Sequence, residues 1–218
     1  MTDMKEYFLT GPGSGMTGIP LVREALQRTN RLGILGDYYE FGIFRGSTLY
    51  NAYDEATRLG NTSMHFWGFD SFQGLPEVKG IDSNRDIFHR GDYECTLENV
   101  IIHLTDCGVD WSRIDLISGW FEESLKSGPT DRMRKAAVIL VDCDLYVSTV
   151  PVLDFILPLL QTGTVLIFDE YGNLGENSGE ALAHLEFSER YPEIISRLEI
   201  GVNPSSGPRA FTIERNKS

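Results

Sequence analysis

The sequence predicts an α/β fold in which a single, doubly wound and mostly parallel sheet carries helices on both faces. Two short apolar runs, at residues 136–141 and 165–168, have the continuous pattern of strands that are buried on both sides of a parallel sheet. Residues 193–201 and 209–214 flank a turn that contains Pro and Gly, which predicts a closing antiparallel pair. The rest of the chain alternates between strand and helix patterns, as a parallel sheet requires.

The segment between the two buried runs is predicted to be a crossover helix. Ser148 and Thr149 are suitable caps, Pro151 suits the first turn, and Gly163 suits the end. Its apolar positions recur at helical spacing and are Val152, Phe155, Ile156, Leu159 and Leu160. Because such crossovers are right-handed, both strands end at the same edge of the sheet, where ligands bind in α/β proteins.

The other elements are expected in order along the chain. Helices are predicted at residues 19–31, 96–107 and 178–190, and from a cap at Ser47 to about residue 58. Strands are predicted at 64–69 and 114–118, with a strand that breaks into a glycine-bearing turn over 38–47 and a turn into a short helix at 119–125. Residues 77–93 are polar and irregular, so we expect them to lie over the ligand edge as a lid that becomes ordered when ligands bind. Residues 9–18 are too rich in glycine for a regular element and are expected to form a lid or a plain loop.

Length and composition predict one soluble domain. The 218 residues suffice for a single α/β core, and 41% hydrophobic with 23% charged residues is ordinary for a globular protein. We divide the chain into an N-terminal lid and helix segment, 1–35, and a main domain, 36–218. The formal net charge of -13 argues against nucleic acid or an anionic membrane as a partner. The first residues lack a signal-peptide pattern, so a cytoplasmic protein is expected.

Three cysteines give neither a disulfide pattern nor a zinc motif. Cys143 lies between two acids, which would raise its pKa, so we interpret it as a packing residue.

Acidic residues follow both strands of the central unit. Asp142 and Asp144 come after the first strand, and Asp169 and Glu170 come directly after the second. Four carboxylates at one edge repel one another unless a cation lies among them, and their hard oxygen atoms suit Mg²⁺. The alternative is that these acids are solvated loop residues. Two acidic pairs on adjacent strands favour the metal.

A glycine-bearing turn and a third acid predict a nucleoside site beside the acids. Gly42 and Gly46 follow a strand and allow a ligand to approach the backbone closely. Asp70 ends the next strand, where a carboxylate can accept both hydroxyls of a ribose. Trp120 follows a third strand end and either stacks on an adenine or fills the core. The spacing Gly-x-x-x-Gly differs from the dinucleotide fingerprint, which argues against a nicotinamide-dependent oxidoreductase.

Five stretches, taken together, resemble the macrocin O-methyltransferase family. They are residues 40–46 (EFGIFRG), 68–76 (GFDSFQGLP), 91–93 (GDY), 141–149 (VDCDLYVST) and 168–171 (FDEY). The family consists of metal-dependent S-adenosylmethionine (SAM) methyltransferases that act on hydroxyls of natural-product sugars. The resemblance covers roughly residues 36–172 and implies a seven-stranded, Rossmann-like class I methyltransferase sheet whose last strand is antiparallel.

The resemblance also implies a site. The expected cofactor-binding residues are Glu40, Gly42, Gly46, Ser47, Asp70, Ser71, Gly119, Trp120 and Asp142. The expected ligands of Mg²⁺ are Asp142, Asp169 and Glu170, although the family commonly has Asp where this chain has Glu170. The expected partner is a small-molecule hydroxyl acceptor, and a homodimer is considered as the assembly.

The proton of the acceptor hydroxyl needs a base, and two residues are considered. Asp144 is the first candidate because it lies two residues from an expected metal ligand, although it would serve equally as a support for the site. His89, on the expected lid, is the second. The alternatives to a sugar O-methyltransferase are a catechol-like O-methyltransferase, a NAD-dependent oxidoreductase on the same topology, and a binding module that has lost catalysis.

Overall fold

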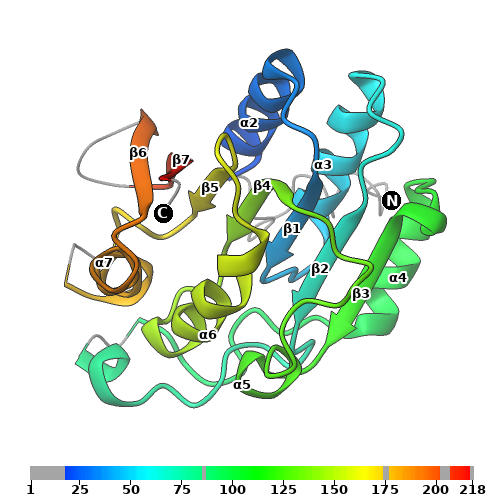
Figure 1. Cartoon of the computed structure of the whole chain (residues 1–218). Helices are drawn as coiled ribbons and strands as arrows, with labels where there is room; N and C mark the ends of the chain where they lie inside the picture. The colour runs from blue at the N-terminus through cyan, green and yellow to red at the C-terminus, as the bar shows by residue number, and fades with distance from the viewer. Residues whose placement is uncertain (1–17, 85–86, 174–176, 202–206, 217–218) are drawn as a thin grey trace.

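A computed structural model describes residues 18–84, 87–173, 177–201 and 207–216 (Figure 1). The helices are α2 (Ile19–Leu32), α3 (Ser47–Arg58), α4 (Leu97–Asp106), α5 (Phe121–Ser124), α6 (Tyr146–Ile156) and α7 (Gly179–Arg190). The strands are β1 (Asp37–Phe41), β2 (Phe66–Asp70), β3 (Ile114–Ser118), β4 (Ala136–Val141), β5 (Val165–Phe168), β6 (Ile194–Gly201) and β7 (Arg209–Arg215). The glycine-rich segment predicted at residues 9–18 lies outside the described residues, except for Gly18.

The seven strands form one sheet in the order β3-β2-β1-β4-β5-β7-β6. The first five are parallel, and β7 pairs antiparallel with both β5 and β6. This confirms the doubly wound, mostly parallel sheet and its antiparallel closing pair. The order reverses between β1 and β4, and such a switch point opens a crevice at the carboxyl ends of the strands.

Two apolar cores lie on the two faces of the sheet because alternate residues of each strand point to opposite faces. On β4, for example, Val138 and Leu140 join α2, α3 and α4 in one core. Ile139 and Val141 join α6 and α7 in the other. Figure 1 shows the sheet between these helical layers. The central strands are fully buried, as their apolar sequence predicts.

The crossover helix begins earlier than predicted. Its first residue is Tyr146, so Pro151 lies inside the helix rather than in its first turn, and Ser148 does not cap it. The cap comes from elsewhere: the carboxylate of Asp82 accepts hydrogen bonds from the backbone N–H groups of Tyr146 (2.8 Å) and Val147 (3.1 Å). Those N–H groups have no partner within the helix, so a distant carboxylate can fix its start.

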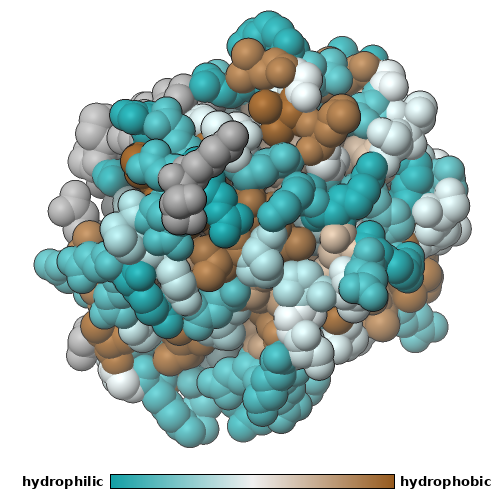
Figure 2. Space-filling model, in the orientation of Figure 1, coloured by the Kyte–Doolittle hydropathy of each residue, from teal (hydrophilic) through white to brown (hydrophobic). Residues whose placement is uncertain are grey.

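Most of the surface visible in Figure 2 is hydrophilic, and apolar side chains group at the end of the molecule where α2 lies. Leu32, the last residue of α2, and Leu35 are exposed large hydrophobic residues. None of the helices in the described part of the chain combines the length and apolar character that crossing a bilayer requires.

Candidate active site

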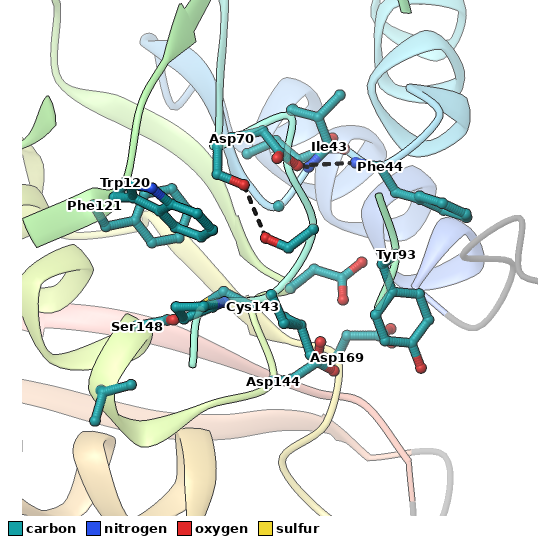
Figure 3. A pocket seen from close by; sticks show the side chains of 18 of the residues that line it. Ile43, Phe44, Asp70, Tyr93, Trp120, Phe121, Cys143, Asp144, Ser148 and Asp169 are labelled. Atoms are coloured by element: carbon teal, nitrogen blue, oxygen red, sulfur yellow. Dashed lines mark hydrogen bonds between the residues drawn. The ribbon is translucent and has the colours of Figure 1, made fainter. Parts of the chain in front are cut away.

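A cavity of about 720 Å³ opens at the carboxyl ends of the parallel strands. Its wall contains residues that end or directly follow β1, β2, β3, β4 and β5, namely Gly42, Asp70, Gly119, Asp142 and Asp169. Figure 3 shows Trp120 and Phe121 on one side of this cavity and Tyr93 on the other, with Asp144 and Asp169 near Tyr93. The cavity therefore has two ends with different chemistry.

The turn after β1 requires glycine at its first position. Gly42 has φ 95°, and a Cβ atom there would lie 1.8 Å from the backbone oxygen of Asp142. The turn consequently passes against the end of β4 with no room for a side chain. Gly46 (φ 80°) immediately precedes α3, so Ser47 is the first residue of that helix and not its cap.

Asp70 holds this turn in place. One carboxylate oxygen accepts the N–H groups of Ile43 (2.7 Å) and Phe44 (3.1 Å), and the other accepts the N–H of Phe72 (2.6 Å). Burial raises the pKa of Asp70, and these three N–H groups oppose the shift. A carboxylate has about four acceptor positions, so little capacity remains for a ligand hydroxyl in this arrangement.

Trp120 belongs to the cavity wall and not to the core. It is partly exposed and precedes α5. The next residue, Phe121, packs edge-on against Phe41 of β1 with ring centroids 6.0 Å apart. The backbone beneath is fixed by the N–H of Gly119, which donates to the carbonyl of Asp70 (2.9 Å). An aromatic side chain on a rigid support suits stacking against a planar ligand group.

The acids after β4 and β5 line the same cavity at one edge of the sheet, as predicted. The N–H of Asp142 donates to the carbonyl of Phe41 (2.8 Å) and that of Asp169 donates to the carbonyl of Val141 (3.1 Å), which continues the sheet bonding past the strand ends. Asp144 and Asp169 are buried, and Asp144 has a left-handed backbone, φ 61°. A buried acid at a positive φ combines two unfavourable features, which is typical of functional sites.

Burial and mutual repulsion disfavour the charged forms of these acids. The pKa of Asp142 is raised well above its usual range by burial and then by the charges of Asp169, Asp144 and Glu180. The pKa of Asp144 is raised to about 8, first by burial and then by Glu170 and Asp169. In chemistry, this set of hard carboxylate oxygens fits a divalent cation, whose charge would offset the repulsion. In geometry, no three acids, histidines or cysteines among the described residues are gathered closely enough to form a metal site.

Glu180, in the first turn of α7, is a site residue that sequence reasoning missed. It is buried, and its two carboxylate oxygens accept the N–H groups of Cys143 (3.2 Å) and Glu170 (3.0 Å). It therefore ties together the two loops that carry the acids. Burial raises its pKa well above the usual range, with smaller contributions from Asp144 and Asp169. An acid near a helix start is an ordinary sequence feature, so no local signal distinguishes it.

Most of the residues predicted for the site line this one cavity. They are Glu40, Gly42, Ser47, Asp70, Ser71, Gly119, Trp120, Asp142, Asp144, Asp169 and Glu170. Gly46 lies behind the wall, where a Cβ atom would be 3.3 Å from Val100. His89 is also outside the lining: its side chain is 63% exposed, with Nδ1 3.5 Å from the carboxylate of Asp92. Cys143 is buried at the cavity base with its pKa raised well above the usual range by burial, as expected for a packing residue.

The sheet order and the cavity at its switch point define a Rossmann-like, class I methyltransferase fold. The solved O-methyltransferase NovP has this fold, with a TM-score of 0.74 at 20% identity over 95% of this chain and 83% of that one. The calicheamicin methyltransferase CalS11 aligns with a TM-score of 0.67 at 22% identity, over 97% of this chain and 86% of that one.

Within that class, residues 13–193 match the family described as Macrocin-O-methyltransferase (TylF). The chain belongs to the macrocin O-methyltransferase family. The 8-demethyl-8-(2,3-dimethoxy-alpha-L-rhamnosyl)-tetracenomycin-C 4'-O-methyltransferase of Streptomyces olivaceus is 34% identical over 145 residues, which are 64% of this chain and 54% of that protein. The mycinamicin III 3''-O-methyltransferase of Micromonospora griseorubida is 28% identical over 170 residues, 72% of this chain and 63% of that protein. The chain thus spans between half and two-thirds of the length of these relatives.

Proposed function

We propose that this protein is a SAM-dependent O-methyltransferase that transfers a methyl group to a sugar hydroxyl of a small natural product, with Mg²⁺ bound at the acid cluster. The observation that carries the proposal is the single cavity whose two ends differ, one with a glycine turn and an aromatic wall, the other with clustered acids. The family membership and the names of the two relatives support the methyl transfer and the sugar acceptor.

The cofactor is assigned to the end of the cavity formed by Gly42, Asp70 and Trp120. The turn at Gly42 lets the amino-acid part of SAM approach the backbone, and Trp120 offers a face for the adenine. Because the carboxylate of Asp70 already accepts three backbone N–H groups, its binding of the ribose would share those positions. Asp70 therefore supports the cofactor site in two ways, through the turn that it holds and through any remaining acceptor position.

The acceptor is assigned to the end that contains Asp142, Asp144, Asp169 and Glu170. Asp142, Asp169 and Glu170 are the proposed ligands of Mg²⁺; because they do not form a closed metal site among the described residues, they would have to draw together around the cation. The cation when bound would supply a positive charge that lowers the pKa of a nearby hydroxyl. Holding that hydroxyl in line with the methyl group can itself contribute several kcal/mol, up to about 7–11 in the best intramolecular cases. The chain's own contribution is therefore mainly alignment and charge.

Asp144 is the proposed base. It lines the cavity, whereas the side chain of His89 projects outside it. Bound SAM would supply the activated methyl group, and the carboxylate of Asp144 would accept the proton that the acceptor hydroxyl loses as its oxygen is methylated. The pKa of Asp144 is raised to about 8, so its ionised form is a stronger base than an ordinary carboxylate, and the charge of bound Mg²⁺ would favour that ionised form.

Binding and activity assays test this proposal directly. The protein is titrated by calorimetry with S-adenosylhomocysteine (SAH) and with NAD, and then incubated with methyl-labelled SAM, Mg²⁺ and either phenyl α-L-rhamnopyranoside or catechol. We expect SAH binding without metal, no NAD binding, and label in the rhamnoside only when Mg²⁺ is present. Labelled catechol alone would replace the sugar assignment with the phenolic one, and absent SAH binding would overturn the proposal.

A further inference from the structure

We infer that Tyr93 binds the acceptor, with its ring packed against the apolar C–H face of a neutral sugar that is held beside the acid cluster. This inference rests on the proposed function and names a binding residue and a ligand class for the acceptor end of the cavity. Four observations carry it: the place of Tyr93 in the wall, its exposure, its backbone conformation, and the charges that surround its hydroxyl.

Tyr93 lies on the opposite side of the cavity from Trp120 (Figure 3). Its ring packs edge-on against Phe44, with centroids 5.8 Å apart, and the guanidinium of Arg45 lies 4.7 Å from the centre of the Phe44 ring. Phe44 belongs to the turn that Asp70 holds by hydrogen bonds. The contact with Phe44 therefore fixes the position of Tyr93 relative to the proposed cofactor site. A ligand touching Tyr93 would therefore be positioned relative to the cofactor.

Tyr93 is 49% exposed although it lies in the cavity wall. An aromatic side chain gains stability when it is buried, so one left half-exposed beside a cavity indicates a surface that a ligand covers. The C–H face of a pyranose is apolar and flat enough to cover it, while the sugar hydroxyls at its rim stay available for polar groups.

The backbone of Tyr93 is left-handed, with φ 60°. Side chains with a Cβ atom are disfavoured there, and glycine would relieve the strain. The conformation is imposed by a short ladder in which the N–H of Leu75 donates to the carbonyl of Asp92 (2.8 Å) and the N–H of Gly91 donates to the carbonyl of Leu75 (3.0 Å). Strain that the surroundings hold in place is a mark of functional positions. Phe72 has a similar φ of 55°, but its side chain is buried in the core, so packing accounts for it.

The hydroxyl of Tyr93 lies in the field of the acids. Burial raises the pKa of Tyr93, followed by the charges of Asp144, Glu170, Asp92 and Asp142. The phenol consequently stays protonated and can donate a hydrogen bond to an acceptor oxygen held near those acids. The lining of the cavity contains eight acids, Glu40, Asp70, Glu77, Glu122, Asp142, Asp144, Asp169 and Glu170, against Arg45 and Lys79. Of those two cations, Lys79 forms an ion pair with Glu77 (2.8 Å). Even with Glu40, Asp70, Asp142 and Asp144, whose pKa values are raised, counted as protonated, the other four acids outnumber the two cations, so a neutral sugar suits this environment better than a phosphorylated one.

Three variants separate the ring, the hydroxyl and the backbone strain. Tyr93→Gly removes the ring and relieves the strain, and Tyr93→Phe removes only the hydroxyl. Trp111→Ala is the control: it removes an aromatic side chain that is 37% exposed and lies outside the cavity lining. For each, calorimetry gives the Kd of SAH, then the Kd of phenyl α-L-rhamnopyranoside for the protein loaded with SAH and Mg²⁺. Thermal unfolding gives the midpoint without ligands.

We expect Tyr93→Gly to weaken rhamnoside binding by about tenfold or more, because the aromatic ring that packs against the sugar is removed. The variant should keep the SAH affinity of the parent, and its midpoint of thermal unfolding should equal or exceed that of the parent. A purely structural role of Tyr93 would not produce this combination. Tyr93→Phe should weaken rhamnoside binding by a smaller factor, and Trp111→Ala should have no effect on it.

Rhamnoside affinity within twofold of the parent in Tyr93→Gly, or an equal loss of SAH affinity, would overturn the inference. A parent protein that binds SAH but no rhamnoside overturns the sugar assignment alone, whereas failure to bind SAH removes the proposed function and this inference with it.

Discussion

At the scale of single residues, the site is unusual for the acids that it buries. Glu40 is the fourth of the five residues of the fully buried strand β1 and is 1% exposed, with one carboxylate oxygen accepting a hydrogen bond from the hydroxyl of Tyr38 (2.6 Å). Burial raises its pKa to about 8, and the hydrogen bond from Tyr38 only partly opposes this. A carboxyl group in this position makes the stability of the ligand-free protein depend on pH.

Glu40→Gln should remove part of that dependence. The folded protein keeps a proton on Glu40 from its ordinary pKa of 4.5 up to about 8, whereas the unfolded chain has lost it. Folding stability from this group therefore falls as pH rises through that window. The variant should match the parent near pH 5 and exceed it near pH 9, by an amount on the order of a few kcal/mol. Urea unfolding at the two pH values measures this, and an equal difference at both would contradict it.

Glu180 offers a second residue-scale prediction, because both of its oxygens act as acceptors. Glu180→Gln replaces one oxygen with an amide group, so either the N–H of Cys143 or that of Glu170 loses its partner. The loops that carry the acids should then shift, since a buried unsatisfied N–H costs about 1–3 kcal/mol. We expect methyl transfer to fall by roughly tenfold, while the Kd of SAH stays within experimental error.

The control for this change is Glu186→Gln on the same helix. Glu186 is exposed and bonds the hydroxyl of Tyr146 (2.6 Å), outside the cavity lining. It should leave methyl transfer unchanged. Comparable losses in both variants would mean that α7 as a whole, rather than the bridge made by Glu180, supports the site.

At the scale of elements, the segment 77–93 is joined to the start of α6 by one side chain. Asp82, in a 3-10 helix at Gly80–Asn84, accepts the first two N–H groups of α6, directly after the loop that carries Asp144. Residues 85–86 lie outside the described part of the chain. The expected ordering of this segment by ligands remains a prediction, and Asp82 is the contact through which it would act.

Asp82→Ala should weaken this attachment. Loss of a helix cap costs about 0.5–2 kcal/mol, so the midpoint of unfolding should fall modestly and proteases should cleave within 77–93 faster. SAH with Mg²⁺ and phenyl α-L-rhamnopyranoside should slow cleavage of the parent more than that of the variant. Ser83→Ala, which removes only a local bond to Gly80, is the control. Cleavage that is equal in the two variants would refute the role of Asp82.

The elements around the site differ in how well the sequence predicts them. Buried strands and most helices follow from apolar runs and spacing; the bounds of Ile114–Ser118, for example, agree with the prediction. The predicted start of α6 was wrong because its cap is a carboxylate 64 residues away, and propensity acts only over a few neighbours. Glu180 was missed for the same reason, since its partners belong to two other loops. The position of His89 depends on how an irregular segment folds, which no periodic pattern encodes.

At the scale of the whole molecule, the sheet brings like charges together from strands that are distant in sequence. Asp142 follows β4 and Asp169 follows β5, and each has its backbone fixed by a hydrogen bond to the neighbouring strand. The fold therefore brings these acids to one edge of the sheet, and their mutual repulsion opposes folding. A bound cation would convert that repulsion into attraction.

The last prediction follows from this opposition. Mg²⁺ should raise the unfolding midpoint of the parent, because a ligand that binds only the folded state stabilises it in proportion to the logarithm of its concentration. EDTA should abolish methyl transfer but leave the Kd of SAH largely intact. Asp142→Asn and Asp169→Asn keep the side-chain shape while removing a charge, so each should raise the metal-free midpoint, cancel the shift caused by Mg²⁺ and reduce turnover by orders of magnitude.

Variants of Glu170 test whether the proposed cation has a third protein ligand besides Asp142 and Asp169. Its carboxylate accepts the side-chain amide of Asn173 (2.9 Å), so a role in holding that loop competes with a role as a metal ligand. Glu170→Asp restores the pair of aspartates common in the family and should keep the shift caused by Mg²⁺ together with methyl transfer. Glu170→Ala should abolish both if the residue binds the cation. Asn173→Ala breaks the same hydrogen bond without removing a carboxylate and should retain both. If Glu170→Ala and Asn173→Ala behave alike, Glu170 supports the loop and the cation is held by Asp142 and Asp169; full activity in EDTA would exclude the metal altogether.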